Sequence, residues 1–191
     1  MRAAFLAFVF AFSIPLAGAA DLDRPIVLVA KPELRDPLYG SAVLVVAPLG
    51  AGQHVGFIVN RPTNVSLGAL FPDDAASKKV VDPVYLGGPV GSELIFALVQ
   101  RKQSPGGNSF EIMPGVYAAF ESAVVDKIIQ SDPQRARFVA GLVAWRPGEL
   151  EAEIDLGAWL VLEPDAAVVT RNPEGLWEEL VRRSQRQRNT I

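Results

Sequence analysis

Prolines and glycines divide the chain into short apolar runs, and this pattern constrains the fold more than any other feature. Three such runs lie near the start of the chain, at 25–30, 41–47 and 55–59. Apolar stretches of this length between turn residues are typical of strands that are buried on both faces. The glycine-rich segment 48–54 between the second and third runs predicts a hairpin. The first part of the chain is therefore predicted to form a sheet.

Helical patterns are fewer and are spread along the chain. Ser66 is predicted to cap a short helix, and apolar residues recur at helical spacing over 122–130. A third helix is predicted over 147–156, with its proline in the first turn, and a fourth from Pro173, with Asn172 as its cap. Further strands are predicted at 84–86, 94–100, 110–119, 137–144 and 159–162. Because strands and helices mix without a regular βαβ order, the sequence predicts α+β, or a mixed α/β sheet, rather than a doubly wound fold.

The first twenty residues have the composition of a secretory signal peptide. Arg2 precedes a long uncharged apolar run, and Ala17–Ala20 supplies the small residues of a cleavage site. Residues 1–20 are therefore predicted to be removed, which leaves a single domain over 21–191 that is periplasmic or secreted. An uncleaved anchor is the alternative, because the uncharged run is just long enough to span a bilayer.

The composition removes several classes of site. The chain has no cysteine and a single histidine, His54, so it can form no disulfide, thiolate nucleophile or site with several histidine ligands. His54 lies in a glycine-rich turn, and no Gly-x-Ser-x-Gly sequence accompanies it, so a serine triad is not expected. We therefore expect no enzymatic activity, no catalytic residue, no metal and no cofactor. The net charge of −3 gives no overall basis for binding a phosphate backbone.

Polar and glycine-rich motifs follow several apolar runs, where binding sites are commonly placed. An arginine can hold an anion there, and the amides of a glycine-rich turn can approach one. The predicted binding surface comprises Asn60, Arg61, Pro62, Gly87, Gly88, Pro89, Trp145, Gly148 and Glu149. Each motif also has a purely structural interpretation, as turn punctuation or as a tight turn with positive φ.

Glu149 and Glu153 lie four residues apart and therefore share one face of the predicted helix. Two carboxylates at this spacing can hold a divalent cation or act as an acid and base pair, so a metal-assisted hydrolase is one alternative. The other interpretation is a solvated acidic face near a helix N-terminus, with Arg146 neutralising one carboxylate. Trp145 and Trp159 flank this helix and are predicted to pack against the sheet.

The chain ends in a basic helix and tail from about residue 173. The arginines concerned are Arg182, Arg183, Arg186 and Arg188. They can make weak contact with an anionic membrane, or they can simply complement the negative C-terminal end of the helix dipole. We expect a monomer with an unidentified protein or small-molecule partner, and no nucleic-acid partner if the chain is exported.

Five segments in this order resemble the YqgE/AlgH family of bacterial proteins. They are 28–37 (LVAKPELRDP), 56–62 (GFIVNRP), 84–90 (VYLGGPV), 145–154 (WRPGELEAEI) and 158–160 (AWL). The resemblance implies a bent sheet that forms a pseudo-barrel with flanking helices, and it implies no catalytic residues. The family name suggests a transcriptional regulator, whereas typical members lack a leader and many carry Gln at the position of Glu149. We therefore expect an exported, non-enzymatic binding or accessory protein, with a cytosolic regulator and the hydrolase as alternatives.

Overall fold

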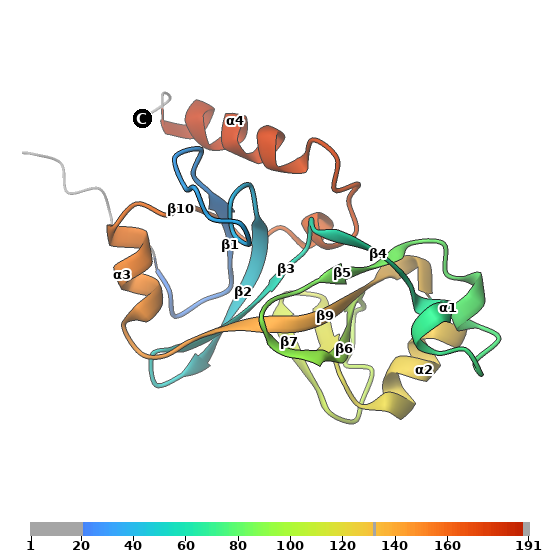
Figure 1. Cartoon of the computed structure of the whole chain (residues 1–191). Coiled ribbons are helices and arrows are strands. Elements are labelled where there is room, and N and C mark those ends of the chain that lie inside the picture. The colour runs from blue at the N-terminus through green and yellow to red at the C-terminus, as the bar shows by residue number, and fades with distance from the viewer. Residues whose placement is uncertain (1–20, 132, 189–191) are drawn as a thin grey trace, which may run out of the picture.

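A strongly curved sheet carries most of the chain, as Figure 1 shows. The structure is a computed structural model that describes residues 21–131 and 133–188, the side chains of residues 187 and 188 excepted, so the predicted signal peptide lies outside the described residues. The elements in chain order are β1 (Ile26–Ala30), β2 (Val43–Gly50), β3 (Gln53–Ile58), β4 (Pro62–Ser66), α1 (Leu67–Leu70), η1 (Ser77–Lys79), β5 (Pro83–Leu86), β6 (Val90–Gln100), β7 (Ser109–Met113), β8 (Val116–Ala119), α2 (Ser122–Ser131), η2 (Pro133–Arg135), β9 (Ala136–Trp145), α3 (Glu149–Asp155), β10 (Trp159–Leu162), η3 (Ala166–Val169) and α4 (Leu176–Arg188).

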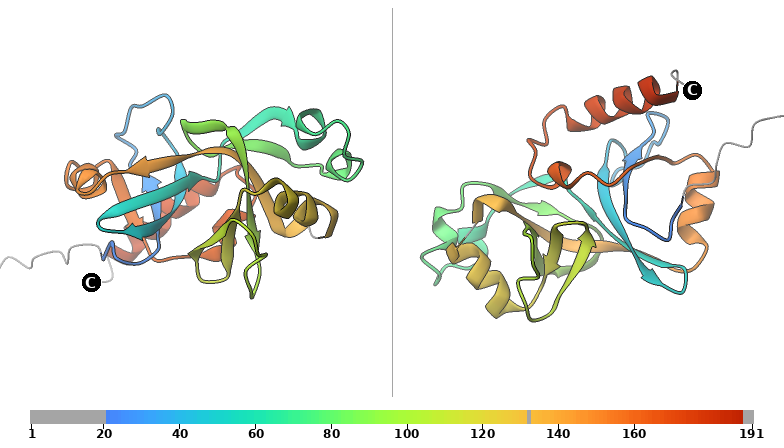
Figure 2. Two further views of the ribbon diagram at one scale, coloured as in Figure 1. Left: turned by 90° about the horizontal axis from the view of Figure 1, so that it is seen from below. Right: turned by 180° about the vertical axis from the view of Figure 1, so that it is seen from behind.

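The described strands form one connected sheet in the order β10-β1-β2-β3-β9-β6-β8-β7, and β5 joins β9 to the short strand β4. Most neighbours are antiparallel, whereas β5 runs parallel to β9. The sheet curls until β7 lies against β2, which produces a half-barrel (Figure 2). The predicted α+β class, the bent pseudo-barrel and the hairpin of the second and third apolar runs are confirmed.

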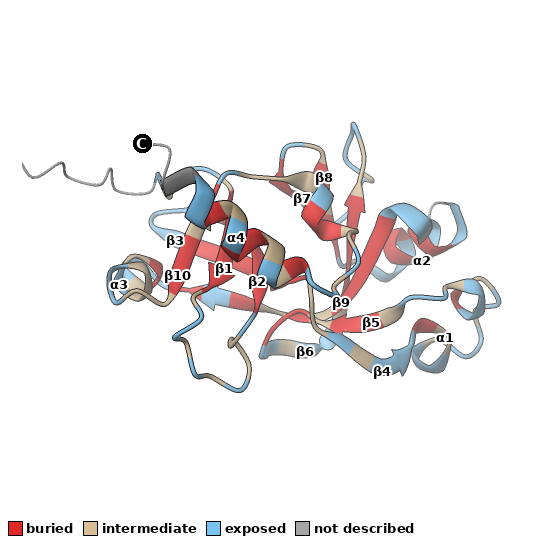
Figure 3. Cartoon of the chain, turned by 90° about the horizontal axis from the view of Figure 1, so that it is seen from above, coloured by how far each residue is buried: buried red, intermediate tan, exposed pale blue. Residues whose placement is uncertain are grey.

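Three apolar cores follow from the alternation of side chains along the strands. Val27 and Val29 face the inside of the curl, together with Phe57 and with Leu176 and Leu180 of α4. The alternate residues of β1 face the opposite side and form a second core beneath α3. A third core lies between α2 and the strands β6, β8 and β9. Figure 3 shows how the buried strands lie beneath helices whose outer faces are exposed.

Two helices begin later than the sequence predicts, because each is preceded by a glycine in the left-handed region. Gly148 has φ +83 and caps α3, so the helix starts at Glu149 and not in the turn of Pro147. Gly175 has φ +72, so α4 starts at Leu176, and Asn172 does not cap this helix. A glycine adopts this conformation without the steric cost that other residues meet, and helical geometry begins only beyond it.

Candidate functional site

Asn60 and Arg61, which follow β3, fix the shape of the loop between β1 and β2. The Asn60 Oδ1 accepts a hydrogen bond of 2.8 Å from the backbone N–H of Val43, and its Nδ2 donates one of 2.9 Å to the carbonyl of Ser41. The Arg61 guanidinium donates to the carbonyl of Gly40. The side chains of Asn60 and Arg61 therefore hold the end of this loop in place through hydrogen bonds to its backbone.

Hydrogen bonds within the loop, residues 31–41, also stabilise its conformation. The Asp36 Oδ1 accepts backbone hydrogen bonds from Leu38 (2.8 Å) and Tyr39 (2.7 Å), and the carbonyl of Asp36 accepts one from Gly40. Ser41 has φ +61, a conformation that costs a residue other than glycine free energy and that surrounding contacts must maintain. The loop is consequently preorganised, with its strained residue next to the carbonyl that Arg61 binds.

A cavity of about 450 Å³ lies between this loop and the start of α4. On the α4 side it is lined by Trp177, whose indole Nε1 donates 2.7 Å to the carbonyl of Ala30 and so fixes the ring. The loop supplies the other lining residues, which are Lys31, Pro32, Leu34, Arg35, Asp36, Pro37, Gly40 and Ser41. Figure 2 shows the loop beneath α4 in the view from behind.

Gly87 and Gly88 lie beside Asn60-Arg61 and allow their backbone to pack closely against β9. The N–H of Leu86 donates to the carbonyl of Arg61, and the N–H of Ile58 donates to the carbonyl of Gly87. A Cβ at Gly87 would lie 2.3 Å from a carbonyl oxygen of β9, and one at Gly88 would lie 2.2 Å from the β9 backbone. Neither glycine has positive φ, so close approach to β9 is what requires them, and both are buried.

The third predicted motif lies at the other end of β3. Trp145 pairs with His54, where β3 begins, whereas Asn60 follows the end of that strand. Gly148 caps α3. The backbone N–H of Arg146 donates a hydrogen bond to the Glu149 carboxylate and is the main cause of the lowered pKa of that carboxyl. The Arg146 guanidinium forms an ion pair of 2.8 Å with the same carboxylate and lowers the pKa further. The structure therefore brings Asn60–Pro62 and Gly87–Pro89 together, while Trp145, Gly148 and Glu149 lie apart from them.

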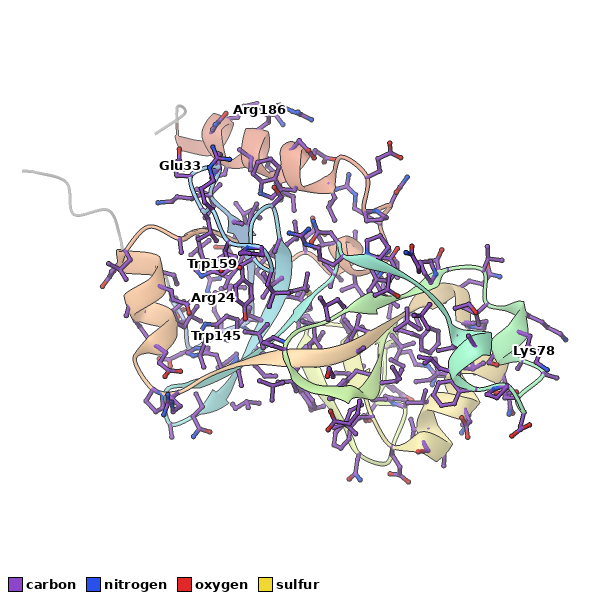
Figure 4. All side chains as sticks on the ribbon, in the orientation of Figure 1. Arg24, Glu33, Lys78, Trp145, Trp159 and Arg186 are labelled. Carbon is purple, nitrogen blue, oxygen red and sulfur yellow. The ribbon has the colours of Figure 1, made fainter. Side chains whose placement is uncertain are left out.

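Glu153 does not share a site with Glu149. Its Oε2 accepts hydrogen bonds from the indole N–H of Trp145 (3.1 Å) and of Trp159 (2.7 Å), and both indoles are buried between α3 and the sheet (Figure 4). Burial raises the pKa of the nearby Tyr39 phenol, and the charge of Glu153 raises it further. The predicted packing of both tryptophans is confirmed, and each carboxylate has its own protein donors.

Two other titratable side chains, those of His54 and Arg137, are also buried in the protein. His54 is buried, and its Nε2 lies 2.9 Å from the carbonyl of Leu22. Arg137 is buried over the ring of Tyr85, with its guanidinium carbon 4.1 Å from the ring centroid, and burial lowers its pKa. It donates to the carbonyls of Val59 and Arg171. Across residues 21–131 and 133–188, no group of three His, Cys, Asp or Glu side chains is arranged to hold a metal.

The basic end of the chain is partly paired. Arg183 of α4 forms an ion pair of 3.0 Å with Asp165, while Arg182 is exposed and the side chain of Arg188 lies outside the described residues. None of the described helices combines the length and the apolar composition needed to cross a membrane. Contact of the tail with anionic lipid stays a prediction.

Sequence reasoning missed the residues that line the cavity against α4. From the sequence, the segment Lys31–Pro37 is predicted only to be a proline-punctuated loop and a part of the family resemblance. The available signal in the loop is two prolines and four charged residues, two of each sign, between apolar runs. On α4, Trp177 stands as an aromatic residue among charged ones, but only the tertiary structure shows that it faces the loop.

Comparison with known proteins places the chain among relatives of similar length. Residues 27–189 match the AlgH-like family, DUF179. A UPF0301 protein of Streptomyces coelicolor is 34% identical over 166 residues, which cover 82% of this chain and 83% of that protein. A UPF0301 protein of Myxococcus xanthus is 33% identical over 163 residues, which cover 83% of this chain and 88% of that protein.

Two solved structures share the architecture. The solution structure of the AlgH protein from Pseudomonas aeruginosa matches with a TM-score of 0.65 at 26% identity and covers 78% of this chain and 80% of that chain. A crystal structure of a Corynebacterium diphtheriae protein matches in fold with a TM-score of 0.68 at 21% identity and covers 83% of this chain and 85% of that chain. The half-barrel fold and the matched sequence together show that this chain belongs to the AlgH-like, or UPF0301, family.

Proposed function

We propose that this member of the AlgH-like family is an exported, non-enzymatic binding protein, and that it binds at the loop 31–41 and the facing side of α4. The main support for the proposal is that Asn60 and Arg61 fix the shape of this loop by hydrogen bonds to its backbone. Preorganisation of a binding loop lowers the entropic cost of association. Asn60-Arg61 and Gly87-Gly88 contribute as supports of the site, because their contacts are with the protein backbone.

The distribution of the titratable groups supports binding rather than catalysis. Glu149 is paired with Arg146, Glu153 accepts from two indoles, and His54 is buried against a backbone carbonyl. An acid and base pair needs groups that reach a substrate, and these side chains instead stabilise the fold. The partner of the proposed site is a small molecule or a segment of another protein, and the chain acts as a monomer.

Export is tested by fractionating cells that produce the full chain. The proposal expects a shortened form that begins near Asp21 in the periplasm or the medium, identified by N-terminal sequencing. A full-length chain confined to the cytosol would instead favour the regulator that the family name suggests. A full-length chain in the inner membrane would indicate an anchor formed by the N-terminal apolar segment.

Binding is tested by placing a photo-reactive residue at Glu33 in one variant and at Lys78 in another. Both positions are exposed, and Figure 4 shows Glu33 beside α4, at the opposite end of the molecule from Lys78. Irradiation of native cells should give mass-shifted adducts from position 33 and not from position 78. Adducts from both positions alike, or from neither, would contradict a binding site at the loop.

A further inference from the structure

Arg137 is a buried arginine without a carboxylate partner. It lies near the start of β9, on the face of that strand that points into the curl of the sheet, and only 3% of its surface is exposed. Among the described residues, no Asp or Glu side chain forms an ion pair with it, and its Nε–H has no acceptor. The exposed Asp82 acts on it through charge alone. Burial of an arginine in this way costs free energy, so stability alone does not explain its presence.

The guanidinium of Arg137 bridges two backbone carbonyls from distant segments of the chain. Its Nη1 donates to the carbonyl of Val59, which follows β3, and its Nη2 donates 2.7 Å to the carbonyl of Arg171, in the turn before α4. The Tyr85 ring lies beneath the guanidinium, 4.1 Å from its carbon to the ring centroid, and Tyr85 is itself paired with Val139 of β9. A planar guanidinium stacked on a ring has its N–H donors in fixed directions, so it holds both carbonyls at once.

Both carbonyls belong to segments that form the proposed binding site. Val59 immediately precedes Asn60, whose side chain holds the loop 31–41. Arg171 precedes α4 and forms an ion pair with Glu179 on that helix. The same helix carries Trp177, which lines the cavity beside the loop. Arg137 is therefore bonded to the two segments that set the distance between the loop and the helix.

We propose that Arg137 is the positioning residue of this binding site, and that it fixes α4 opposite the loop 31–41 by holding the carbonyls of Val59 and Arg171. Arg137 touches no ligand and acts through the segments that it joins. The proposal rests on the function proposed above and adds the residue that sets the shape of the site. A methionine would fill the same space but would leave both carbonyls without this donor, and a lysine has one nitrogen in place of the two that hold them.

The first measurement uses an unsubstituted chain of residues 21–191, so it does not depend on whether a variant folds. Nitrogen-15 NMR should give separate, slowly exchanging Nη signals for Arg137, because two hydrogen bonds and the Tyr85 ring restrict rotation of the guanidinium. The exposed Arg182 serves as the reference and should give one averaged signal. An averaged Nη signal from Arg137 would overturn the proposed bridge between Val59 and Arg171.

The second measurement follows the position of α4 by electron–electron resonance between spin labels. The chain has no cysteine, so cysteines introduced for labelling react alone. Labels at Lys127 of α2 and Glu178 of α4 report on α4, and labels at Lys127 and Ala152 of α3 form the reference pair; all three positions are exposed, and Figure 1 shows the three helices well apart.

Arg137→Met should widen the distance distribution between positions 127 and 178 and leave that between 127 and 152 unchanged. Hydrogen exchange of the Leu176 and Glu179 amides, at the start of α4, should become about tenfold faster or more, because a hydrogen bond from a charged donor is lost. Arg137→Lys should lie between the parent chain and Arg137→Met. Parent-like distances and exchange in Arg137→Met, or in Arg137→Lys, would overturn the need for the two-nitrogen bridge.

Gly56→Ala separates positioning from a general loss of stability. A Cβ at Gly56 crowds the Trp145 ring in the core beneath α3, which Arg137 does not join. This variant should therefore keep the parent distance distribution between positions 127 and 178. A distribution as wide as that of Arg137→Met would show that any destabilisation releases α4, which contradicts a specific role for Arg137.

Photo-crosslinking from position 33 links the position of α4 to binding. Arg137→Met should lower the yield of adducts about tenfold in cells that contain equal amounts of folded protein. If the parent chain gives adducts and Arg137→Met gives the same yield, the binding function stands and the positioning role of Arg137 is wrong. If the parent chain gives no adducts, the proposed function fails, and the role of Arg137 in that site fails with it.

Discussion

Replacement of Asn60 by alanine tests whether this motif holds the loop between β1 and β2. The change removes the acceptor of the Val43 N–H and the donor to the Ser41 carbonyl. Val43 is completely buried, so its N–H would lose its partner without gaining water. A buried donor without a partner costs about 1–3 kcal/mol, and the more exposed Ser41 carbonyl adds about 1 kcal/mol or less. We expect Asn60→Ala to lower the free energy of unfolding by about 1–4 kcal/mol.

The assay is urea unfolding of a chain of residues 21–191, followed by tryptophan fluorescence, together with hydrogen exchange of the Val43 amide. Asn64→Ala is the matched control, because Asn64 is exposed and its side chain makes no hydrogen bond within the described residues. This control should change stability by no more than about 0.5 kcal/mol. An Asn60→Ala chain as stable as the control, with unchanged exchange at Val43, would refute the assignment of Asn60 as the support of the loop.

Three further substitutions probe the core beneath α3. Gly56→Ala places a Cβ 2.8 Å from the ring of Trp145, so urea unfolding should show a loss of about 1–3 kcal/mol, and unchanged stability would contradict this tight contact. Glu153→Gln replaces a charged acceptor of the Trp145 and Trp159 indoles and should cost about 1 kcal/mol; unaltered tryptophan emission and stability would argue against it. The pKa of Tyr39 is raised above its ordinary 10.0 by burial and by Glu153, so its ionisation opposes folding. The free energy of unfolding should hold up to about pH 10 and fall as the pH rises through the folded pKa, and Tyr39→Phe should reduce that fall; an identical alkaline profile would count against the burial of the phenol.

Apolar patterning was enough to place most of the elements. The runs at 25–30 and 159–162 become β1 and β10, and the helical stripe at 122–130 becomes α2. Such segments are predictable because burial of one face depends on the spacing of neighbouring residues along the chain. The starts of α3 and α4 were less accurate, because a single glycine with positive φ decides where each helix begins.

The candidate site depended on contacts between distant segments, which spacing does not encode. The sequence marked Asn60-Arg61 and Gly87-Gly88 as unusual, and the structure shows that the first pair holds a loop and the second permits close approach to β9. The side chain of Trp177 donates to the carbonyl of Ala30, a residue 147 positions away in the sequence.

The sequence by itself determined the class of fold, the absence of cysteine chemistry and the family resemblance, because each depends on local pattern or composition. Only the tertiary structure decided that Glu149 and Glu153 have separate partners and that Trp177 of α4 lines a cavity beside the loop 31–41. The physical reason is that side-chain periodicity fixes which face a residue occupies. The curl of the sheet and the crossing of α4 fix what lies opposite that face.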